Sequence, residues 1–387
     1  MPGAFKVALL IETSNRYGRD LLYGVRDWIQ KRGERWSISF TEQARRAPLP
    51  SWLSNWEGDG VIARVDSAAA AKTLRRLKIP VVDVSADRPT SEFPRVSIDN
   101  VAVARLAVAH LQSKGLRNFA YVGDHRFIWS RQRADEFCRL MAKEGKPCRV
   151  YSEPSVAVAT APSADVELRA IAAWLQNLSR PVGVFACYDN RALQVLEACQ
   201  LLGLSVPDEV AVIGVDDDEV LCHLSNPPLT SVLPNARLTG FEAAAQLSRL
   251  MHGEKIESQT SFIEPIRVVE RQSTDASAVA DPKIAAALRY INDHACEGID
   301  VSDVLRAVPV SRTLFDRRFK ALLGHSPHQH IVNKRIERAK SLLIDSDLSV
   351  AVIAELVGFA NTSYLSTVFR RVTKMSPKAF REKMRTR

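Results

Sequence analysis

Residues 349–374, SVAVIAELVGFANTSYLSTVFRRVTK, contain two short segments with apolar faces on either side of Gly358-Phe359. Apolar residues recur at helical spacing in both segments, which predicts a helix, a tight turn and a second helix capped by Asn361 or Thr362. The residues expected to face inward are Val352, Ile353, Leu356, Leu365, Phe369 and Val372. This arrangement is typical of a helix-turn-helix.

A second segment with the same pattern lies upstream. Residues 301–324, VSDVLRAVPVSRTLFDRRFKALLG, again predict a short helix, a turn at Pro309-Val310, a polar cap at Ser311 and a second helix. A longer helix is expected from Pro327 to about residue 343, between the two units. One such pattern could be the surface of an ordinary helical bundle, whereas two copies favour a nucleic-acid-binding domain.

The charge distribution supports the interpretation that this domain binds nucleic acid. Residues 282–387 hold 19 Lys and Arg but 10 Asp and Glu, a net charge of +9, which equals the formal charge of the whole chain. The first 281 residues are therefore neutral overall. A basic domain beside a neutral body suggests a polyanionic partner, usually nucleic acid.

The motif spacing in this domain resembles the signature of the AraC/XylS family of transcription regulators. The matching residues in the second unit are Ala354, Val357, Gly358, Phe359, Tyr364, Phe369, Ser376, Pro377, Phe380 and Arg381, and those in the first are Ser311, Arg312, Phe319, Lys320, Gly324, Ser326 and Pro327. The resemblance implies that two recognition helices enter successive major grooves of DNA. It places at base-facing positions Arg312, Thr313, Asp316 and Arg317 of the first helix and Thr362, Ser363 and Thr367 of the second. The polar faces also carry basic residues for phosphates, among them Arg371.

The first 270 residues alternate short β-branched runs with amphipathic helical stretches. Strands are expected at 6–11, 37–41, 60–64, 81–84, 95–98, 119–122, 149–151, 183–187, 210–215 and 229–233. This alternation predicts a doubly wound α/β arrangement, and the length favours two lobes, with the pattern restarting near Asn118. We therefore expect a two-lobed α/β sensor at 1–270, a linker at 271–283 and an all-α double helix-turn-helix domain at 284–387.

Sequence motifs for catalysis or metal binding are missing from this body. It holds no G-x-G-x-x-G, Walker loop, G-x-S-x-G or H-E-x-x-H, which argues against an enzyme, and we expect no cofactor and no metal. The six cysteines are scattered, as expected of reduced thiols in the cytoplasm. Neither a secretory signal nor a membrane-spanning run is apparent. A small-molecule sensor is the interpretation that remains.

The motif order resembles the periplasmic-binding-protein-like core of the LacI/GalR regulators. The matching pieces are DGVIA at 59–63, SIDN at 97–100, HLQSKG at 110–115, YDNRAL at 188–193, VIGVDDDE at 212–219 and LTSV at 229–232. Such a sensor followed by an AraC-type domain resembles the arrangement of xylose operon regulators. The resemblance implies a sugar ligand, and D-xylose follows from the resemblance alone.

Ligands of open α/β sheets bind at the carboxyl ends of the strands. The family match places Asp216 and Arg133 where sugar-binding Asp and Arg lie. Carboxylates accept from neighbouring hydroxyls and arginines donate to others, while Tyr17, Phe127 or Trp129 can cover an apolar sugar face. Further ligand candidates at strand ends are Tyr188, Asp189 and Asp99. For Asp99 and Asp189 a helix-capping role remains open, and we expect Asp217 and Asp218 to be solvated or to cap.

These features together predict a cytoplasmic, sugar-responsive transcription regulator that binds operator DNA, acts as an activator through RNA polymerase, and forms a homodimer through its sensor. The alternatives are a regulator of another pentose or hexose and a carbohydrate-binding transport protein. The basic C-terminal region argues against the latter, and we expect no membrane contact.

Overall fold

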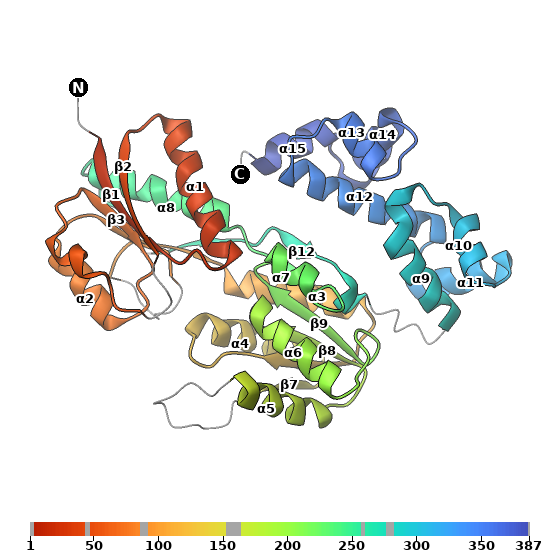
Figure 1. The fold of residues 1–387 in the computed structure, drawn as a ribbon. Coiled ribbons are helices and arrows are strands. Elements are labelled where there is room, and N and C mark those ends of the chain that lie inside the picture. The colour runs from red at the N-terminus through yellow and green to blue at the C-terminus, as the bar shows by residue number, and fades with distance from the viewer. Residues whose placement is uncertain are drawn as a thin grey trace. The chain divides into compact units, whose positions relative to one another are not determined.

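The structure, a computed structural model, describes residues 4–42, 47–85, 92–151, 164–256, 260–275 and 282–385. It divides into two compact units, residues 1–275 and residues 276–387, which are described separately (Figure 1). Residues 276–281 of the expected linker lie outside the described residues.

The first unit contains two six-stranded sheets, one in each of two lobes. The sheet of the first lobe has the order β11-β5-β4-β3-β1-β2, with every strand parallel to its neighbours. Its strands are β1 (Phe5–Ile11), β2 (Trp36–Glu42), β3 (Gly60–Ala63), β4 (Val81–Asp83), β5 (Arg95–Ile98) and β11 (Thr260–Ile263). Its helices are α1 (Arg16–Arg32), the 3-10 turn η1 (Ser51–Asn55), α2 (Ala68–Arg76) and α8 (Ala236–Met251). The predicted two-lobed α/β fold is confirmed.

The first strand of the second lobe begins at Asn118, where the pattern is expected to restart. Its sheet has the order β12-β10-β9-β8-β6-β7. The strands are β6 (Asn118–Val122), β7 (Cys148–Val150), β8 (Val182–Ala186), β9 (Val210–Val215), β10 (Thr230–Leu233) and β12 (Arg267–Val269). The helices are α3 (Asn100–Ser113), α4 (Ile128–Lys143), α5 (Ala164–Gln176), α6 (Asp189–Leu201) and α7 (Glu219–Leu224), followed by the turn η2 (Gln272–Thr274). Central strands such as β9 are buried along their whole length, which explains their uninterrupted apolar sequences.

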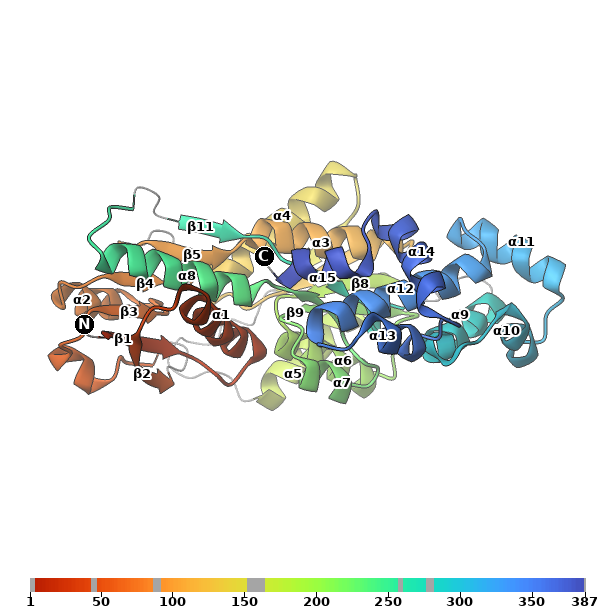
Figure 2. The same cartoon turned by 90° about the horizontal axis from the view of Figure 1, so that it is seen from above.

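The chain passes between the lobes more than once. Helix α3 follows β5 of the first lobe but packs in the core of the second, whereas α8 follows β10 and packs beside α1 against the first sheet (Figure 2). Strand β11 then completes the first sheet, and β12 pairs antiparallel with β10 in the second. These crossings bring strand ends from distant parts of the sequence to one interlobe region.

The expected boundary at residue 270 is wrong, because the first unit continues to Asp275. Ser273 and Thr274 are fully buried. Ser273 Oγ donates to the Val212 carbonyl at 2.6 Å, and Thr274 Oγ1 lies 2.8 Å from Thr230 Oγ1. A segment rich in small polar residues therefore forms part of the fold here, because short hydroxyl side chains can satisfy buried backbone groups.

The second unit is helical throughout its described part. It comprises α9 (Pro282–His294), η3 (Ala295–Glu297), α10 (Val301–Ala307), α11 (Arg312–Leu323), α12 (Pro327–Asp345), α13 (Val350–Leu356), α14 (Thr362–Thr373) and α15 (Pro377–Arg385). Helices α10 and α11 form one helix-turn-helix and α13 and α14 the other, with α12 between them in sequence. Asn361 Oδ1 caps α14 by accepting from the Tyr364 N–H at 2.8 Å, whereas Ser311 occupies the cap position of α11 without a side-chain cap bond.

Candidate functional site

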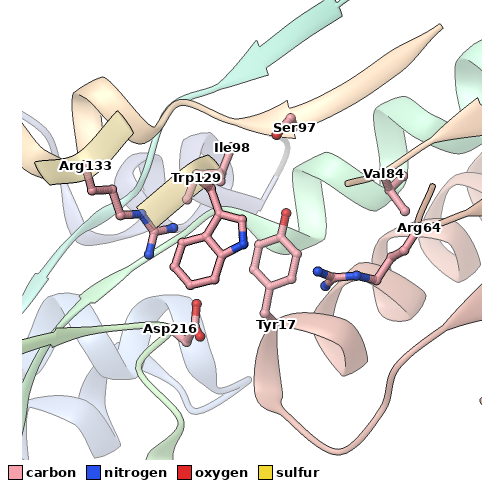
Figure 3. Close-up of a pocket in the computed structure, with 8 residues that line it drawn as sticks. All are labelled: Tyr17, Arg64, Val84, Ser97, Ile98, Trp129, Arg133 and Asp216. Carbon is pink, nitrogen blue, oxygen red and sulfur yellow. The ribbon is translucent and has the colours of Figure 1, made fainter. Parts of the chain in front are cut away.

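A pocket lies between the two lobes of the first unit (Figure 3). It is lined by Tyr17, Arg64, Val84, Ser97, Ile98, Trp129, Arg133 and Asp216. Most of these residues follow or end strands: Arg64 follows β3, Val84 follows β4 and Asp216 follows β9. Figure 3 shows Tyr17 and Arg64 of the first lobe facing Trp129, Arg133 and Asp216 of the second.

Contacts within the protein hold the side chain of Arg133 in one orientation. Its side chain is only 4% exposed, Nε donates to Asn100 Oδ1 at 3.0 Å, and Nη1 donates to the Cys187 carbonyl. The guanidinium lies 4.8 Å from the centre of the Trp129 ring, which is itself stacked on Phe127 with centroids 5.1 Å apart. These contacts stabilise one orientation of an arginine and an indole one helical turn apart on α4.

Asp216 sits at a backbone bend. Its φ of 107° lies in the left-handed region that non-glycine residues rarely adopt, and its N–H donates to the Val232 carbonyl at 3.1 Å. Such outliers are often found where a side chain serves a functional site. Burial raises the pKa of the nearby Tyr17 hydroxyl, the charge of Arg64 opposes that rise, and the charge of Asp216 adds to it. Tyr17 is therefore a neutral donor and acceptor at neutral pH.

The pocket thus offers a carboxylate, two guanidinium groups, a phenol and an indole face. A carboxylate accepts two hydroxyl hydrogens and guanidinium groups donate to hydroxyl oxygens. The flat faces of Trp129 and Tyr17 suit the apolar side of a ring. This combination matches a small polyhydroxylated molecule.

Three of the residues predicted for the pocket do not line it. Asp99 caps α3, where Oδ1 accepts from the Ala102 N–H at 2.9 Å, so the capping alternative is the correct one. Tyr188 instead packs against Trp129, with the two rings edge-to-face and their centroids 5.9 Å apart. Asp189 is 2% exposed and does not reach the pocket.

Asp189 instead positions the loop that carries Asp216. Its Oδ2 accepts from the Asp218 N–H at 2.8 Å and its Oδ1 contacts Ser231 Oγ at 2.6 Å. Burial raises the pKa of Asp189 well above its ordinary value, and the negative charge of Asp216 adds to this effect. Ser231 Oγ donates to this carboxyl, and that hydrogen bond opposes the rise in the pKa of Asp189.

Asp217 and Asp218, expected to be solvated or to cap, are buried at 4% and 6% exposure. Asp217 Oδ2 pairs with Arg16 at 2.7 Å and Oδ1 pairs with Arg271 at 2.8 Å. Asp218 Oδ2 accepts from the Arg16 N–H at 2.9 Å. Arg16 belongs to the first lobe, so these acidic residues join the lobes directly beside the pocket. Arg16 lies about 200 residues away from them in sequence, so the acidic run by itself does not predict this contact.

The second unit presents two helices with basic, solvent-facing sides. On α11, Arg312, Thr313 and Arg317 are exposed, and the half-exposed Asp316 lies 4.0 Å from Arg312. On α14, Ser363, Thr367 and Arg371 are exposed and Thr362 is partly exposed. Ser366, Thr367, Arg370 and Arg371 line a surface hollow on that helix. The predicted base-facing residues therefore occupy the solvent side of each second helix.

The opposite sides of both helices are anchored in separate cores. Phe315 and Phe319 of α11 and Leu365 and Phe369 of α14 are fully buried. Arg335 of α12 donates to the Ala295 carbonyl at 2.7 Å and to the Ile299 carbonyl at 2.6 Å, which fixes α12 against the turn before α10. Two recognition-type helices are thus held in one unit. An α-helix of this kind fits the major groove.

Metal-binding clusters and membrane-spanning helices are both absent from the described residues. Among them no cluster of three or more His, Cys, Asp or Glu side chains is arranged to hold a metal ion. No helix in that part of the chain is long and apolar enough to cross a bilayer.

Comparisons with known proteins match both units. Three family models match: an XylR N-terminal domain over residues 6–104, a periplasmic binding protein-like domain over 108–274 and a helix-turn-helix domain over 304–383. The xylose operon regulatory protein of Escherichia coli K12 is 34% identical over 97% of this chain and 97% of its own length. That of Haemophilus influenzae is 33% identical over 97% and 98%.

Solved structures give the same picture. The structure of the xylose-binding transcription activator xylR has a TM-score of 0.64 and 32% identity and covers 98% of both chains. A complex of the transcriptional regulator CelR with cellobiose has a TM-score of 0.56 at 22% identity, covering 70% of this chain and 86% of its own, which supports the fold of the first unit alone.

Proposed function

Because the chain belongs to the family of xylose operon regulatory proteins, we propose that it is a transcription regulator, and not an enzyme, that binds D-xylose in its interlobe pocket and DNA through α11 and α14. The observation that carries this proposal is the convergence of Tyr17 and Arg64 from one lobe with Trp129, Arg133 and Asp216 from the other. Two separate lobes that share one pocket can respond to a ligand by changing their relative position.

The proposed sugar contacts follow from the chemistry of each side chain. Asp216 accepts from two neighbouring sugar hydroxyls, while Arg133 and Arg64 donate to hydroxyl or ring oxygens. Trp129 covers one face of the sugar ring. Asp189 and Tyr188 act indirectly, the first through the loop that holds Asp216 and the second through the Trp129 ring.

Coupling to DNA is proposed to run through Asp217. This residue follows the sugar-contacting Asp216 and pairs both with Arg16 of the first lobe and with Arg271, close to the end of the first unit. Sugar binding at Asp216 would therefore bias the contacts that hold the lobes together and the segment leading to the DNA-binding unit. Coupling between two sites is a free energy shared by both ligands.

On DNA, Arg312, Thr313, Asp316 and Arg317 of α11, with Thr362, Ser363 and Thr367 of α14, are proposed to face base edges, and Arg371 to contact phosphate. Asp316 suits the amino group of a cytosine. The basic unit, with a net charge of +9, supplies attraction that does not depend on sequence. We further propose a cytoplasmic homodimer that activates transcription in contact with RNA polymerase.

The sugar assignment is tested by titration calorimetry of the full chain with D-xylose, D-ribose, L-arabinose and D-glucose. We expect D-xylose to bind at least ~10-fold more tightly than the others, a difference of about 1.4 kcal/mol. Glu219→Ala is a matched control, since Glu219 is exposed on α7 near the pocket loop and does not line the pocket. Binding of a phosphorylated sugar but of no free aldose would show that Arg64 and Arg133 hold a phosphate, and would overturn the assignment.

A further inference from the structure

Two cysteines of the second lobe lie side by side outside the sugar pocket. Cys138 on α4 and Cys148 on β7 place their sulfur atoms 2.7 Å apart. Both side chains are half-buried, whereas Cys187, Cys199 and Cys222 are buried. A disulfide bond is ~2.05 Å long, so these sulfurs need to move by less than ~1 Å to form one.

The fold itself brings the pair together. Strand β7 is parallel to β6, with Cys148 opposite Phe119, and the Phe119 ring packs edge-to-face on Phe137, the neighbour of Cys138, at a centroid distance of 6.5 Å. Both cysteines border the same apolar core. The two cysteines are therefore close because α4 packs on the edge of the sheet. Their contact does not require an exposed side chain to adopt one particular conformation.

The two thiols differ chemically. A hydrogen bond from Cys148 lowers the pKa of Cys138, although partial burial opposes that shift. The same hydrogen bond and burial raise the pKa of Cys148. Cys138 is thus the more acidic of the two thiols and gives the nucleophilic thiolate more readily, and Cys148 is the partner that can resolve its oxidised product.

We propose that Cys138 and Cys148 are a redox modification site, at which a hydroperoxide converts the dithiol into a reversible disulfide. The Cys138 thiolate attacks a peroxide oxygen, an S–O bond forms, the O–O bond breaks, and water leaves after protonation. The Cys148 sulfur then attacks the Cys138 sulfenic acid, an S–S bond forms, and a second water leaves. With hydrogen peroxide, two thiols and one peroxide give one disulfide and two waters, a two-electron oxidation of the protein.

The disulfide would tie the middle of α4 to the edge strand β7. Because Trp129 and Arg133 lie on the same helix, the bond would fasten the element that supplies two of the pocket residues. The sulfurs are already adjacent, so closure should stabilise this arrangement of the lobe. For a loop of this length we expect the melting temperature of the sensor to rise by roughly 5–10 °C.

The test uses the full chain, reduced with dithiothreitol, freed of reductant and treated with hydrogen peroxide. Non-reducing peptide mapping should recover a cross-linked pair containing Cys138 and Cys148, and fresh dithiothreitol should separate it. In Cys148→Ser, the Cys138 sulfenic acid should persist and be trapped by dimedone. Cys296→Ser is the matched control, since Cys296 is also half-buried, and it should leave the cross-link unchanged.

The readout is independent of sugar and DNA binding, so the proposal can fail while the assigned function stands. Recovery of both cysteines as free thiols after peroxide treatment that oxidises the partly exposed Met251 would overturn it.

Discussion

Arg16 Nη1 lies 2.7 Å from Asp217 Oδ2 and 2.6 Å from the Asp217 carbonyl, so one guanidinium holds both the side chain and the backbone of the residue after Asp216. Arg16 begins α1 in the first lobe, and Asp217 follows β9 in the second. Arg271 occupies the other carboxylate oxygen of Asp217 at 2.8 Å. The three side chains connect the pocket, the interlobe boundary and the end of the first unit.

This relationship predicts the effect of removing one charge. Asp217→Asn should weaken D-xylose binding by ~10-fold or more, because hydrogen bonds to charged groups contribute about 1.5–3 kcal/mol and two partly buried arginines lose a charged partner. Asp165→Asn is a suitable control, since its pair with Arg169 is exposed at 68% and 75%. Titration calorimetry measures both; equal affinities in Asp217→Asn and the parent would show that the pair does not support the ligand-binding arrangement.

A second prediction concerns the raised pKa of Asp189. Between the ordinary carboxyl pKa of about 4 and the raised value, the folded state binds more protons than the unfolded state. The free energy of unfolding should therefore fall as the pH rises through that window. Asp189→Asn keeps an oxygen that can accept from the Asp218 N–H but removes the titrating carboxyl, so it should flatten this fall.

Urea unfolding between pH 5 and pH 8 measures this effect. Asp189→Ala, which removes both hydrogen bonds, should instead lower stability by about 1–3 kcal/mol across the range. If the parent and Asp189→Asn lose stability with pH at the same rate, the buried carboxyl is not the group responsible.

Two arginines in the DNA-binding unit should behave differently. Arg312→Ala should reduce operator affinity by ~1–3 kcal/mol and relax the preference at one base pair, since a bidentate arginine specifies guanine. Arg371→Ala should weaken binding to all sequences alike and reduce the salt slope by about one. Fluorescence anisotropy over a salt series, with mutated operator sequences, separates the two effects. If Arg312→Ala lowers the affinity for all operator sequences alike, as Arg371→Ala should, then Arg312 contacts the DNA phosphate backbone.

Gly358 in the turn of the second helix-turn-helix should not tolerate a side chain. Its φ is 74°, and a Cβ would lie 2.7 Å from the Gly298 nitrogen and 2.8 Å from the Cys296 carbonyl oxygen. Gly358→Ala should therefore destabilise the unit by more than ~1 kcal/mol and reduce DNA affinity. Gly324 shares the positive φ, but a Cβ there would meet no atom within 4 Å, so Gly324→Ala should destabilise the unit less. Circular dichroism melts in which Gly324→Ala is the less stable of the two variants would contradict this packing.

The sequence predicted the elements whose signal is local. Alternation of apolar runs located the strands from β1 to β10, and the two helix-turn-helix units follow from apolar spacing and turn residues. Family resemblance selected Arg133 and Asp216, which line the pocket together with Tyr17 and Trp129. Arg64 also lines the pocket, but no motif in the sequence distinguishes it from the other polar residues at strand ends.

Features that depend on distant partners escaped prediction. Val352, Leu356 and Val372, expected inward, are 40%, 51% and 38% exposed, while Ala354, Val357 and Phe315 are buried instead. In a short helix, the spacing of apolar residues predicts how wide the buried face is. It does not predict which of two adjacent residues faces the core, because the few neighbouring elements decide that. Strands β11 and β12 have only a few residues each, and their pairing is decided by the return of the chain between the lobes.

The most direct test of the account is operator affinity of the full chain with and without saturating D-xylose, in the parent and in Asp216→Ala. In the parent, xylose should change the operator Kd by at least ~5-fold, and operator DNA should change the xylose Kd by the same factor, as linkage requires. Asp216→Ala should keep the sugar-free operator Kd and lose the change. An operator Kd in the parent that stays the same with saturating xylose would contradict the account.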